Sequence, residues 1–251
     1  MNFPLISIIT ITLNSEKYLE QTIQSVVKQS YKNKEYIVID GASTDSTVDI
    51  IKNHASQINK WISESDKGIA DAMNKGLKVA TGDYILFLHS DDYLADENAL
   101  EEASQFMGQK QDMFLFNLYF LDNDNKTLSR PRGLSWWMNF KTGVLHQSCI
   151  CSKNLFEKLG YFDTNFKIAM DYDFFLRAYR SGIKTKYIDL PLSVMRKTGI
   201  SSRLDWPYLT KRFSEEREIQ LKNCNSLIMK SAYRIYWPTY LAYRLARLSF
   251  Y

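Results

Sequence analysis

Apolar strand-like runs alternate with amphipathic helical segments through the first part of the chain, and this alternation limits the fold more than any other feature. The patterns predict strands over 5–13, 35–40, 61–63 and 83–88, and helices over 16–29, 43–53 and 69–79. A helix between two strands returns the chain in the same direction, so such units build parallel sheets with helices on both faces. The sequence therefore predicts an α/β fold with a mostly parallel central sheet flanked by helices.

The alternation weakens in the second half of the chain. We expect a helix near 98–106, a strand over 112–121 with a hairpin return, helices over 155–159 and 171–180, and a strand over 183–190. Residues 133–143 fit no regular element. From Trp206 onward the pattern is helical, with Pro207 suited to a first turn and Pro238 expected to break or kink the later part. We therefore expect one large domain over 1–204 and a helical C-terminal extension over 205–251.

Composition excludes several classes of protein. No run approaches the roughly 18 apolar residues that a membrane-spanning helix needs. The apolar run near the N-terminus has no basic leader and is interrupted by polar residues, so it indicates a first strand and not a signal peptide. Cys149, Cys151 and Cys224 fit neither a zinc site nor a disulfide framework, which favours reduced thiols in the cytoplasm.

Two adjacent carboxylates, Asp91 and Asp92, directly follow the apolar run that ends at Leu88. In open α/β sheets, ligands bind beyond the carboxyl ends of the strands, so the pair is expected to face a crevice. Two carboxylates held together repel, and a divalent ion with oxygen ligands compensates that repulsion. The alternative is a cap for a helix that begins soon after Ala95.

Several separated segments together are similar to family 2 glycosyltransferases of the GT-A fold, of the bacterial polysaccharide type. The segments that carry the resemblance are Ser7–Asn14, Ile37–Asp45, Ser63–Gly76, Leu88–Asp92, His146–Ser148 and Ala169–Arg177. Together they extend over roughly residues 5–203, and the C-terminal tail lies outside them. The resemblance implies a Rossmann-like GT-A domain that moves one sugar, with inversion, from a nucleotide-diphosphate sugar to an acceptor.

The resemblance also implies where the donor binds. It makes Asp92 a ligand of Mg²⁺ or Mn²⁺, although Ser90 replaces the first carboxylate of the usual Asp-x-Asp motif. UDP-sugars are the expected donors, because Asp40 lies where relatives accept a hydrogen bond from uracil, although Leu13 replaces a common base-stacking aromatic. For Asp40 the alternative is a cap of the following turn. The expected donor-binding residues are Thr10, Thr12, Asn14, Asp40, Asp66, Asn74 and Asp91.

On the acceptor side, the resemblance makes Asp171 the catalytic base, with Met170 in place of the usual preceding acid. An inverting transfer needs such a base to take the proton of the acceptor hydroxyl. The alternative for Asp171 is a helix N-cap, and Asp173 is expected to form a cap or an ion pair. His146 and Gln147 are expected to line the acceptor pocket, the alternative for His146 being an ordinary packed histidine.

Two further basic features have open interpretations. Residues 199–203 resemble a loop that closes over the diphosphate, so Arg196 or Arg203 either binds phosphate or is a surface cation. The tail has no acidic residue after Glu218 and mixes cations with aromatics, which suits an anionic membrane surface. A helical hairpin packed on the domain or on another subunit is the alternative.

These features together predict a cytoplasmic enzyme, peripheral on the inner face of the cell membrane, that acts on a glycan or lipid-linked acceptor in surface polysaccharide biosynthesis. One alternative is a non-catalytic nucleotide-sugar-binding protein of the same fold. Another is a nucleotidyltransferase, but Asn14–Lys17 lacks the glycine-rich basic loop that such an enzyme needs. A nucleic-acid partner is not expected, because the cations lie at one end without a nucleic-acid motif.

Overall fold

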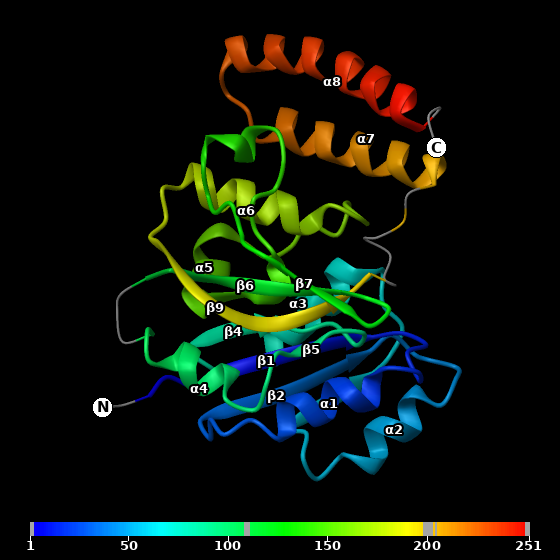
Figure 1. The fold of residues 1–251 in the computed structure, drawn as a ribbon, viewed down its shortest axis with the longest axis vertical. Coiled ribbons are helices and arrows are strands. Elements are labelled where there is room, and N and C mark those ends of the chain that lie inside the picture. The colour runs from blue at the N-terminus through cyan, green and yellow to red at the C-terminus, as the bar shows by residue number, and fades with distance from the viewer. Residues whose placement is uncertain (1–2, 108–110, 198–202, 204, 249–251) are drawn as a thin grey trace.

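A computed structural model describes residues 3–107, 111–197, 203 and 205–248, and a mixed sheet forms the centre of this part (Figure 1). The strand order is β3-β2-β1-β4-β8-β6-β9-β5, and β7 pairs with β6. The strands are β1 (Ile6–Thr12), β2 (Lys34–Asp40), β3 (Lys60–Ser63), β4 (Tyr84–Phe87), β5 (Tyr93–Leu94), β6 (Met113–Asp122), β7 (Asn125–Ser129), β8 (Cys149–Ser152) and β9 (Thr185–Arg196).

Helices cover both faces of this sheet. The α-helices are α1 (Leu19–Val27), α2 (Thr47–Asn53), α3 (Ile69–Val79), α4 (Ala99–Ser104), α5 (Lys153–Leu159), α6 (Met170–Arg180), α7 (Trp206–Lys222) and α8 (Leu227–Leu248). Two short 3₁₀ helices, η1 (Trp136–Asn139) and η2 (His146–Ser148), lie in the segment between β7 and β8. The expected α/β fold, with a helical C-terminal extension, is confirmed.

The strands β3, β2, β1 and β4 run parallel, so their carboxyl ends meet at one edge of the sheet. In this register Thr12 lies opposite Asp40, and Asp40 lies opposite Ser63. Beyond β4 the sheet is mixed: β8 is antiparallel to β4 and β6, whereas β9 is parallel to β6. The predicted elements of the first half are thus confirmed, while the short strands β5 and β8 were not predicted.

The last strand, β9, extends to Arg196, although we expected it to end near residue 190. The expectation failed because Pro191 cannot donate a ladder hydrogen bond and normally ends a strand. Here β9 passes through a register irregularity at which Pro191 lies opposite Asn117, and regular pairing resumes at Ser193. The additional length of β9 matters for the site, because it carries Arg196 to Asp91 and Asp92.

Two hydrophobic cores lie on opposite faces of the sheet, as the alternation along β1 requires. Ile9 and Ile11 belong to the core under α3, α5 and α6. Ile6 and Ile8 belong to the core under α1, α2 and α4. Every residue of β1 is buried, which is typical of a central parallel strand covered by helices on both faces.

The C-terminal extension is a helical hairpin that packs on the domain, in the order α6, α7, α8 away from the sheet (Figure 1). Its small core contains Phe213 of α7 and Tyr233 and Trp237 of α8. Pro238 does not end α8, and the Thr239 hydroxyl donates to the carbonyl of Ile235 within the helix. Of the two interpretations of the tail, the packed hairpin is therefore present, and these three aromatic residues are buried inside it.

Candidate active site

Asp40 ends β2 with a fully buried carboxylate that is already hydrogen-bonded. Its Oδ2 accepts from the Ser63 hydroxyl at 2.6 Å and from the Ser43 N–H at 3.1 Å, and its Oδ1 accepts from the Ser43 hydroxyl at 2.5 Å. The carboxylate thus caps the turn after β2 and links it to β3. Asp40 has the geometry of the structural alternative, and Oδ1, which accepts one hydrogen bond, retains an acceptor position for a nucleobase N–H.

Leu13, Gly41 and Asp66 lie together beside Asp40. A Cβ atom on Gly41 would stand 2.5 Å from Asp66 Oδ2 and 3.4 Å from Leu13 Cδ1, so the position has no room for a side chain. Asp66 is partly buried and accepts from the Gly68 N–H at 2.8 Å, while the Leu13 side chain is 56% exposed. An apolar surface therefore adjoins a carboxylate at the carboxyl ends of β1 and β2.

Thr12 and Asn14 occupy the same edge in different ways. The hydroxyl of Thr12 is buried and has no hydrogen-bond partner within the described residues, a state that a ligand contact would resolve. Asn14 adopts a left-handed conformation with φ 49°, and its Oδ1 accepts from the Thr44 N–H at 2.9 Å. Its side chain therefore fixes the loop after β2, and the residue itself remains exposed.

Two residues expected to bind the donor are instead part of the packed interior. Thr10 is fully buried, and its hydroxyl accepts from the Tyr36 hydroxyl on the face of the sheet under α1 and α2. Asn74 uses both ends of its amide on Phe162: Nδ2 donates to the carbonyl at 2.9 Å and Oδ1 accepts the N–H at 3.0 Å. The donor-binding role expected for these two residues is therefore not supported, because their polar atoms are already paired inside the protein.

Asp91 and Asp92 follow β4, at the same edge as Asp40. Asp92 is 1% exposed, and its Oδ1 accepts from the Arg196 N–H at 3.2 Å. Burial, and then the adjacent charge of Asp91, raise the pKa of Asp92 well above its ordinary value. Asp91 is only partly buried, and burial also raises its pKa. Such a pair favours a bound cation, because a cation would offset both the repulsion and the lost hydration.

Oxygen ligands from one or two carboxylates, completed by phosphate oxygens, suit Mg²⁺. Within the described residues no three His, Cys, Asp or Glu side chains gather as a metal site. Asp91 and Asp92 are the carboxylates that would hold such an ion, and they leave most of its coordination positions to the substrate. This set fits a metal that binds together with a diphosphate.

Arg196 holds the carboxylate loop in place. Its guanidinium donates to the carbonyl of Asp91 and to Gln21 Oε1. It lies 4.4 Å from the ring centroid of Tyr18 and 4.9 Å from that of Tyr93, so it packs between two aromatic rings. Arg196 is only 7% exposed, so the surface-cation interpretation is wrong, and its contacts give it a structural role in place of phosphate binding.

Residues 199–202, most of the loop expected to close over the diphosphate, lie outside the described part. Arg203 is described and is a largely exposed cation, whose Nε donates to Asp205 at 2.8 Å.

Asp171 lies in the first turn of α6 with its side chain 24% exposed. Its Oδ2 is 3.5 Å from His146 Nδ1, and its Oδ1 accepts from the Tyr172 N–H at 2.8 Å. Burial alone would raise the pKa of Asp171, but His146, the Tyr172 N–H and the charge of Arg212 lower it. The carboxylate is therefore ionised at neutral pH, as a base must be.

His146 and Gln147 of η2 connect Asp171 with the carboxylate pair. His146 Nε2 lies 3.3 Å from His89 Nε2, and His89 is two residues before Asp91. Gln147 is close enough to Asp92 to moderate the rise in its pKa, and its own Nε2 donates to Met195 Sδ at 3.2 Å. Burial and the nearby His146 lower the pKa of His89 to about 3, so His89 is neutral. The two sides of the site thus meet through η2.

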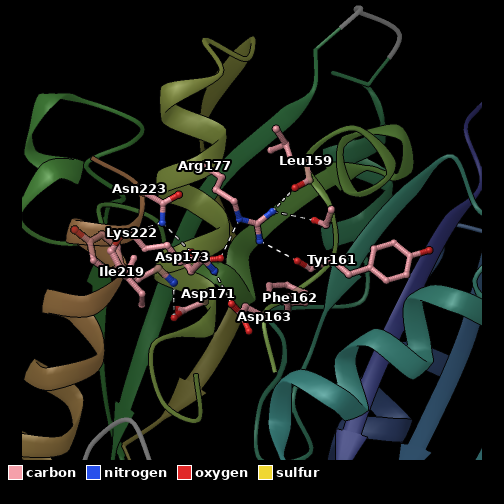
Figure 2. A network of polar contacts seen from close by, with 12 residues as sticks. Leu159, Tyr161, Phe162, Asp163, Asp171, Asp173, Arg177, Ile219, Lys222 and Asn223 are labelled. Atoms are coloured by element: carbon pink, nitrogen blue, oxygen red, sulfur yellow. Dashed lines mark hydrogen bonds and ion pairs between the residues drawn. The ribbon is translucent and has the colours of Figure 1, made fainter. Parts of the chain in front are cut away.

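Asp173, two residues after Asp171, is part of a buried network (Figure 2). Its Oδ2 accepts from Arg177 Nε at 2.9 Å, and its Oδ1 accepts from Asn223 Nδ2 at 2.9 Å. Arg177 also donates to the carbonyls of Leu159 and Tyr161. The ion pair expected for Asp173 is confirmed, and it fixes α6 to α7 and to the segment after α5.

Glu215 of α7 holds the chain that leads into Asp171. Its Oε1 accepts from the Lys167 N–H at 3.0 Å, and its Oε2 accepts from the N–H groups of Ile168 and Ala169 at 2.8 and 2.9 Å. These donors come just before α6 begins, where a carboxylate also interacts favourably with the helix dipole. The C-terminal extension therefore positions the first turn of α6.

No roles for Glu215, Arg212 or His89 were predicted from the sequence. The signal for His89 was its place between the strand and the carboxylate pair. Glu215 and Arg212 gave no signal, because they lie in the extension, far from the motifs in the sequence.

Comparisons with known proteins agree with this geometry. The model of the glycosyl transferase family 2 matches residues 7–180. The chain belongs to this family. An uncharacterized glycosyltransferase of Mycobacterium tuberculosis is 35% identical over 184 residues, with 70% of this chain and 69% of that protein covered. This family 2 glycosyltransferase is also 28% identical over 210 residues to a PGL/p-HBAD biosynthesis glycosyltransferase of M. tuberculosis, with 79% of each chain covered.

Solved structures show the same GT-A fold. TarS of S. aureus, residues 1–349 in complex with UDP-GlcNAc, has a TM-score of 0.72 at 24% identity, covering 88% of this chain and 68% of that one. The longer TarS chain is covered to only 40%. Mannosyltransferase PcManGT of Pyrobaculum calidifontis, in complex with GDP-Man and Mn²⁺, has a TM-score of 0.68 at 18% identity, covering 99% and 75%.

Proposed function

We propose that this glycosyltransferase transfers one sugar, with inversion, from a UDP-sugar to a hydroxyl of a glycan or lipid-linked acceptor in surface polysaccharide biosynthesis. The observation that carries the proposal is Asp171, which is ionised, partly exposed and joined through His146 to the loop of Asp91 and Asp92. A single displacement needs a base for the acceptor hydroxyl and groups that bind the leaving diphosphate. Asp171 supplies the base, and Asp91 and Asp92 lie on the diphosphate side of the same site.

The donor nucleotide is proposed to bind along the carboxyl ends of β1 and β2. Asp40 and Asp66 supply acceptors for the N–H groups of a base, and Leu13 supplies an apolar surface beside them. Thr12 has an unpaired hydroxyl at the same edge, and Asn14 fixes the adjoining loop. The UDP-GlcNAc complex of TarS supports a uridine nucleotide, since TarS is more similar to this chain, at 24% identity, than the GDP-Man-bound PcManGT is, at 18%.

Asp92, with Asp91 beside it, is proposed to hold Mg²⁺ or Mn²⁺, and Asp91, as the more accessible carboxylate, to contact the donor. The Mn²⁺ and GDP-Man complex of PcManGT supports a divalent ion. A bound ion neutralises charge that develops on the leaving diphosphate. The Arg196 N–H holds the Asp92 carboxylate in place at this position.

Asp171 is proposed to take the proton from the acceptor hydroxyl while the acceptor oxygen attacks the anomeric carbon. The new bond forms on the face opposite the nucleotide, so the carbon–oxygen bond to the diphosphate breaks with inversion. His146 keeps Asp171 in place and lowers its pKa, and with Gln147 it lines the acceptor side. In this assignment Asp171 acts as the base in a single displacement, and no covalent intermediate with the enzyme is needed.

Metal-dependent hydrolysis of a panel of nucleotide sugars tests the function. We expect release of nucleotide from at least one UDP-sugar with Mn²⁺ or Mg²⁺, and little release after chelation with EDTA. Water replaces the acceptor in this assay, so the acceptor need not be known. GDP-sugars and dTDP-sugars serve as controls for the nucleotide. Equal and metal-independent turnover of every donor, or no turnover of any, would contradict the proposal.

We also propose that the enzyme works at an anionic membrane surface on the cytoplasmic side. No helix in the described part is long and apolar enough to cross a membrane. Helix α8 nevertheless exposes Ile228 and Ile235, at 82% and 70%, seven residues apart and so on one helical face. Arg234 on the same helix is exposed and supplies positive charge. Apolar and cationic side chains together favour interfacial binding.

Replacing Ile228 and Ile235 together by serine is expected to weaken binding to anionic vesicles by about tenfold or more, because each buried isoleucine contributes roughly 1.5–3 kcal/mol. Co-sedimentation with vesicles containing phosphatidylglycerol measures this. Leu128→Ser is the control, since Leu128 is 42% exposed on β7. If the double variant co-sediments with the vesicles as well as the wild type does, the proposal that α8 binds the membrane is wrong.

A further inference from the structure

A small cavity of about 180 Å³ lies between α7, α8 and the segment after η1. The charged residues that line it in the described part are Lys141, Arg203, Arg212, Arg244 and Glu216. It is smaller than the roughly 300–1,000 Å³ of pockets that enclose drug-sized ligands. Its size suits a small charged group and not a nucleotide sugar.

The cations of this cavity are incompletely neutralised. Glu216 pairs with Arg212 at 2.9 Å. Lys141 donates to the Tyr240 hydroxyl at 2.6 Å and makes no ion pair with a carboxylate within the described residues. Arg244 lies over the ring of Phe213, 5.7 Å from its centroid, and likewise has no carboxylate partner in the described range. The cavity therefore has an excess of positive charge that an anion would balance.

The cavity adjoins the acceptor side of the site. Arg212 and Glu216, which line it, are both close enough to Asp171 to interact with its charge. Asp91 and Asp92, which are proposed to bind the sugar donor, follow β4 and do not line the cavity. Most of the lining residues belong to α7 and α8, and Lys141, Thr142 and Arg203 come from the domain before them, so the cavity lies where the extension packs on the domain.

We propose that this cavity binds a phosphate group carried by the acceptor, and that it holds the acceptor with its hydroxyl toward Asp171. The inference rests on the proposed transferase function and names the chemistry of its second substrate. Guanidinium groups bind phosphate oxygens through charge-assisted, often paired hydrogen bonds, and Lys141 adds a point charge. The phosphate belongs either to a lipid phosphate or to a soluble phosphorylated glycan.

Calorimetry on the full chain, with the donor site filled by UDP and Mg²⁺, tests the proposal with two probes: inorganic phosphate and decyl phosphate below its micelle concentration. We expect both probes to bind the wild-type protein, and Lys141→Gln and Arg244→Gln each to weaken that binding by about tenfold. Arg217→Gln, at an exposed position of α7 outside the cavity, is the matched control and should bind as the wild type does. Thermal melting verifies that each variant is folded.

Tighter binding of decyl phosphate than of inorganic phosphate supports a lipid phosphate, and equal binding supports a soluble phosphorylated glycan. No binding to the UDP-saturated wild type, or equal binding by the wild type and both variants, would overturn the proposal. Those results leave the donor-hydrolysis test untouched, so failure of this inference is distinct from failure of the proposed function.

Discussion

Asp171→Asn is expected to lower sugar transfer by a factor of about 10²–10⁴, with UDP binding unchanged. Asparagine keeps the size and the Oδ1 acceptor for the Tyr172 N–H but cannot take a proton from the acceptor. Steady-state transfer assays and calorimetry with UDP and Mn²⁺ measure the two effects. Turnover equal to that of the wild type would remove Asp171 from its role as base.

Asp173→Asn provides the contrast for this experiment. Asp173 is buried in an ion pair with Arg177, so removing its charge leaves Arg177 without its partner. Breaking such a pair costs about 3–5 kcal/mol. We expect a clear loss of thermal stability and a loss of activity only in proportion to the folded fraction, which separates a structural aspartate from the catalytic one.

The direction of the pKa shift also fixes the pH dependence of Asp171. Because the folded protein holds this pKa below its ordinary value, the ionised form is stabilised, and that contribution is lost only as the pH falls through the lowered pKa. The base should therefore remain active across the mildly acidic range. The acid limb of the profile of kcat/KM in the wild type, measured with saturating metal, reports this.

Asp92→Asn is expected to abolish metal-dependent turnover while making the metal-free protein more stable, by about 2–4 °C in Tm for each kcal/mol gained. The reason is that Asp92 is buried beside Asp91, so its charge opposes folding; asparagine retains an oxygen for the Arg196 N–H without that charge. The raised pKa means that this carboxyl favours the folded state at low pH and loses that contribution as the pH rises through the folded pKa.

Thermal melting with and without Mn²⁺ and UDP measures the stability effect. The wild type should gain stability from the two ligands together, and Asp92→Asn should gain much less. Asp124→Asn changes the net charge equally at an exposed turn and is the control. A metal-free Asp92→Asn protein that melts below the wild type, or that retains Mn²⁺-dependent turnover, would contradict the assignment.

The elements of the first half could be predicted because they depend on local patterns. The run Ile6–Thr12 is rich in isoleucine and threonine, β-branched residues that favour strands, and α3 matches its predicted range of 69–79. The second half was harder, since β8 is too short to show a period and Pro191 hid the continuation of β9. In both cases neighbouring strands, and not local propensity, decide the strand.

The candidate site divides in the same way. The motifs identified Asp91, Asp92, Asp171 and His146, and the fold brings these residues together. The motifs could not reveal that both polar atoms of the Asn74 amide are hydrogen-bonded to Phe162, or that Thr10 is fully buried. A polar residue near a motif is a candidate ligand in the sequence, but only its partners in space tell whether its atoms are free.

The sequence by itself determined the α/β fold, the family and the positions of Asp92 and Asp171 next to predicted elements. The reason is that strand–helix alternation, and the place of a residue beside a strand or helix, are properties of local chain order. Only the tertiary structure decided that the basic tail is a hairpin whose α7 holds α6 through Glu215 and Asn223. Those contacts join residues about fifty positions apart. Long-range packing of this kind leaves no local pattern, and it sets the environment of Asp171.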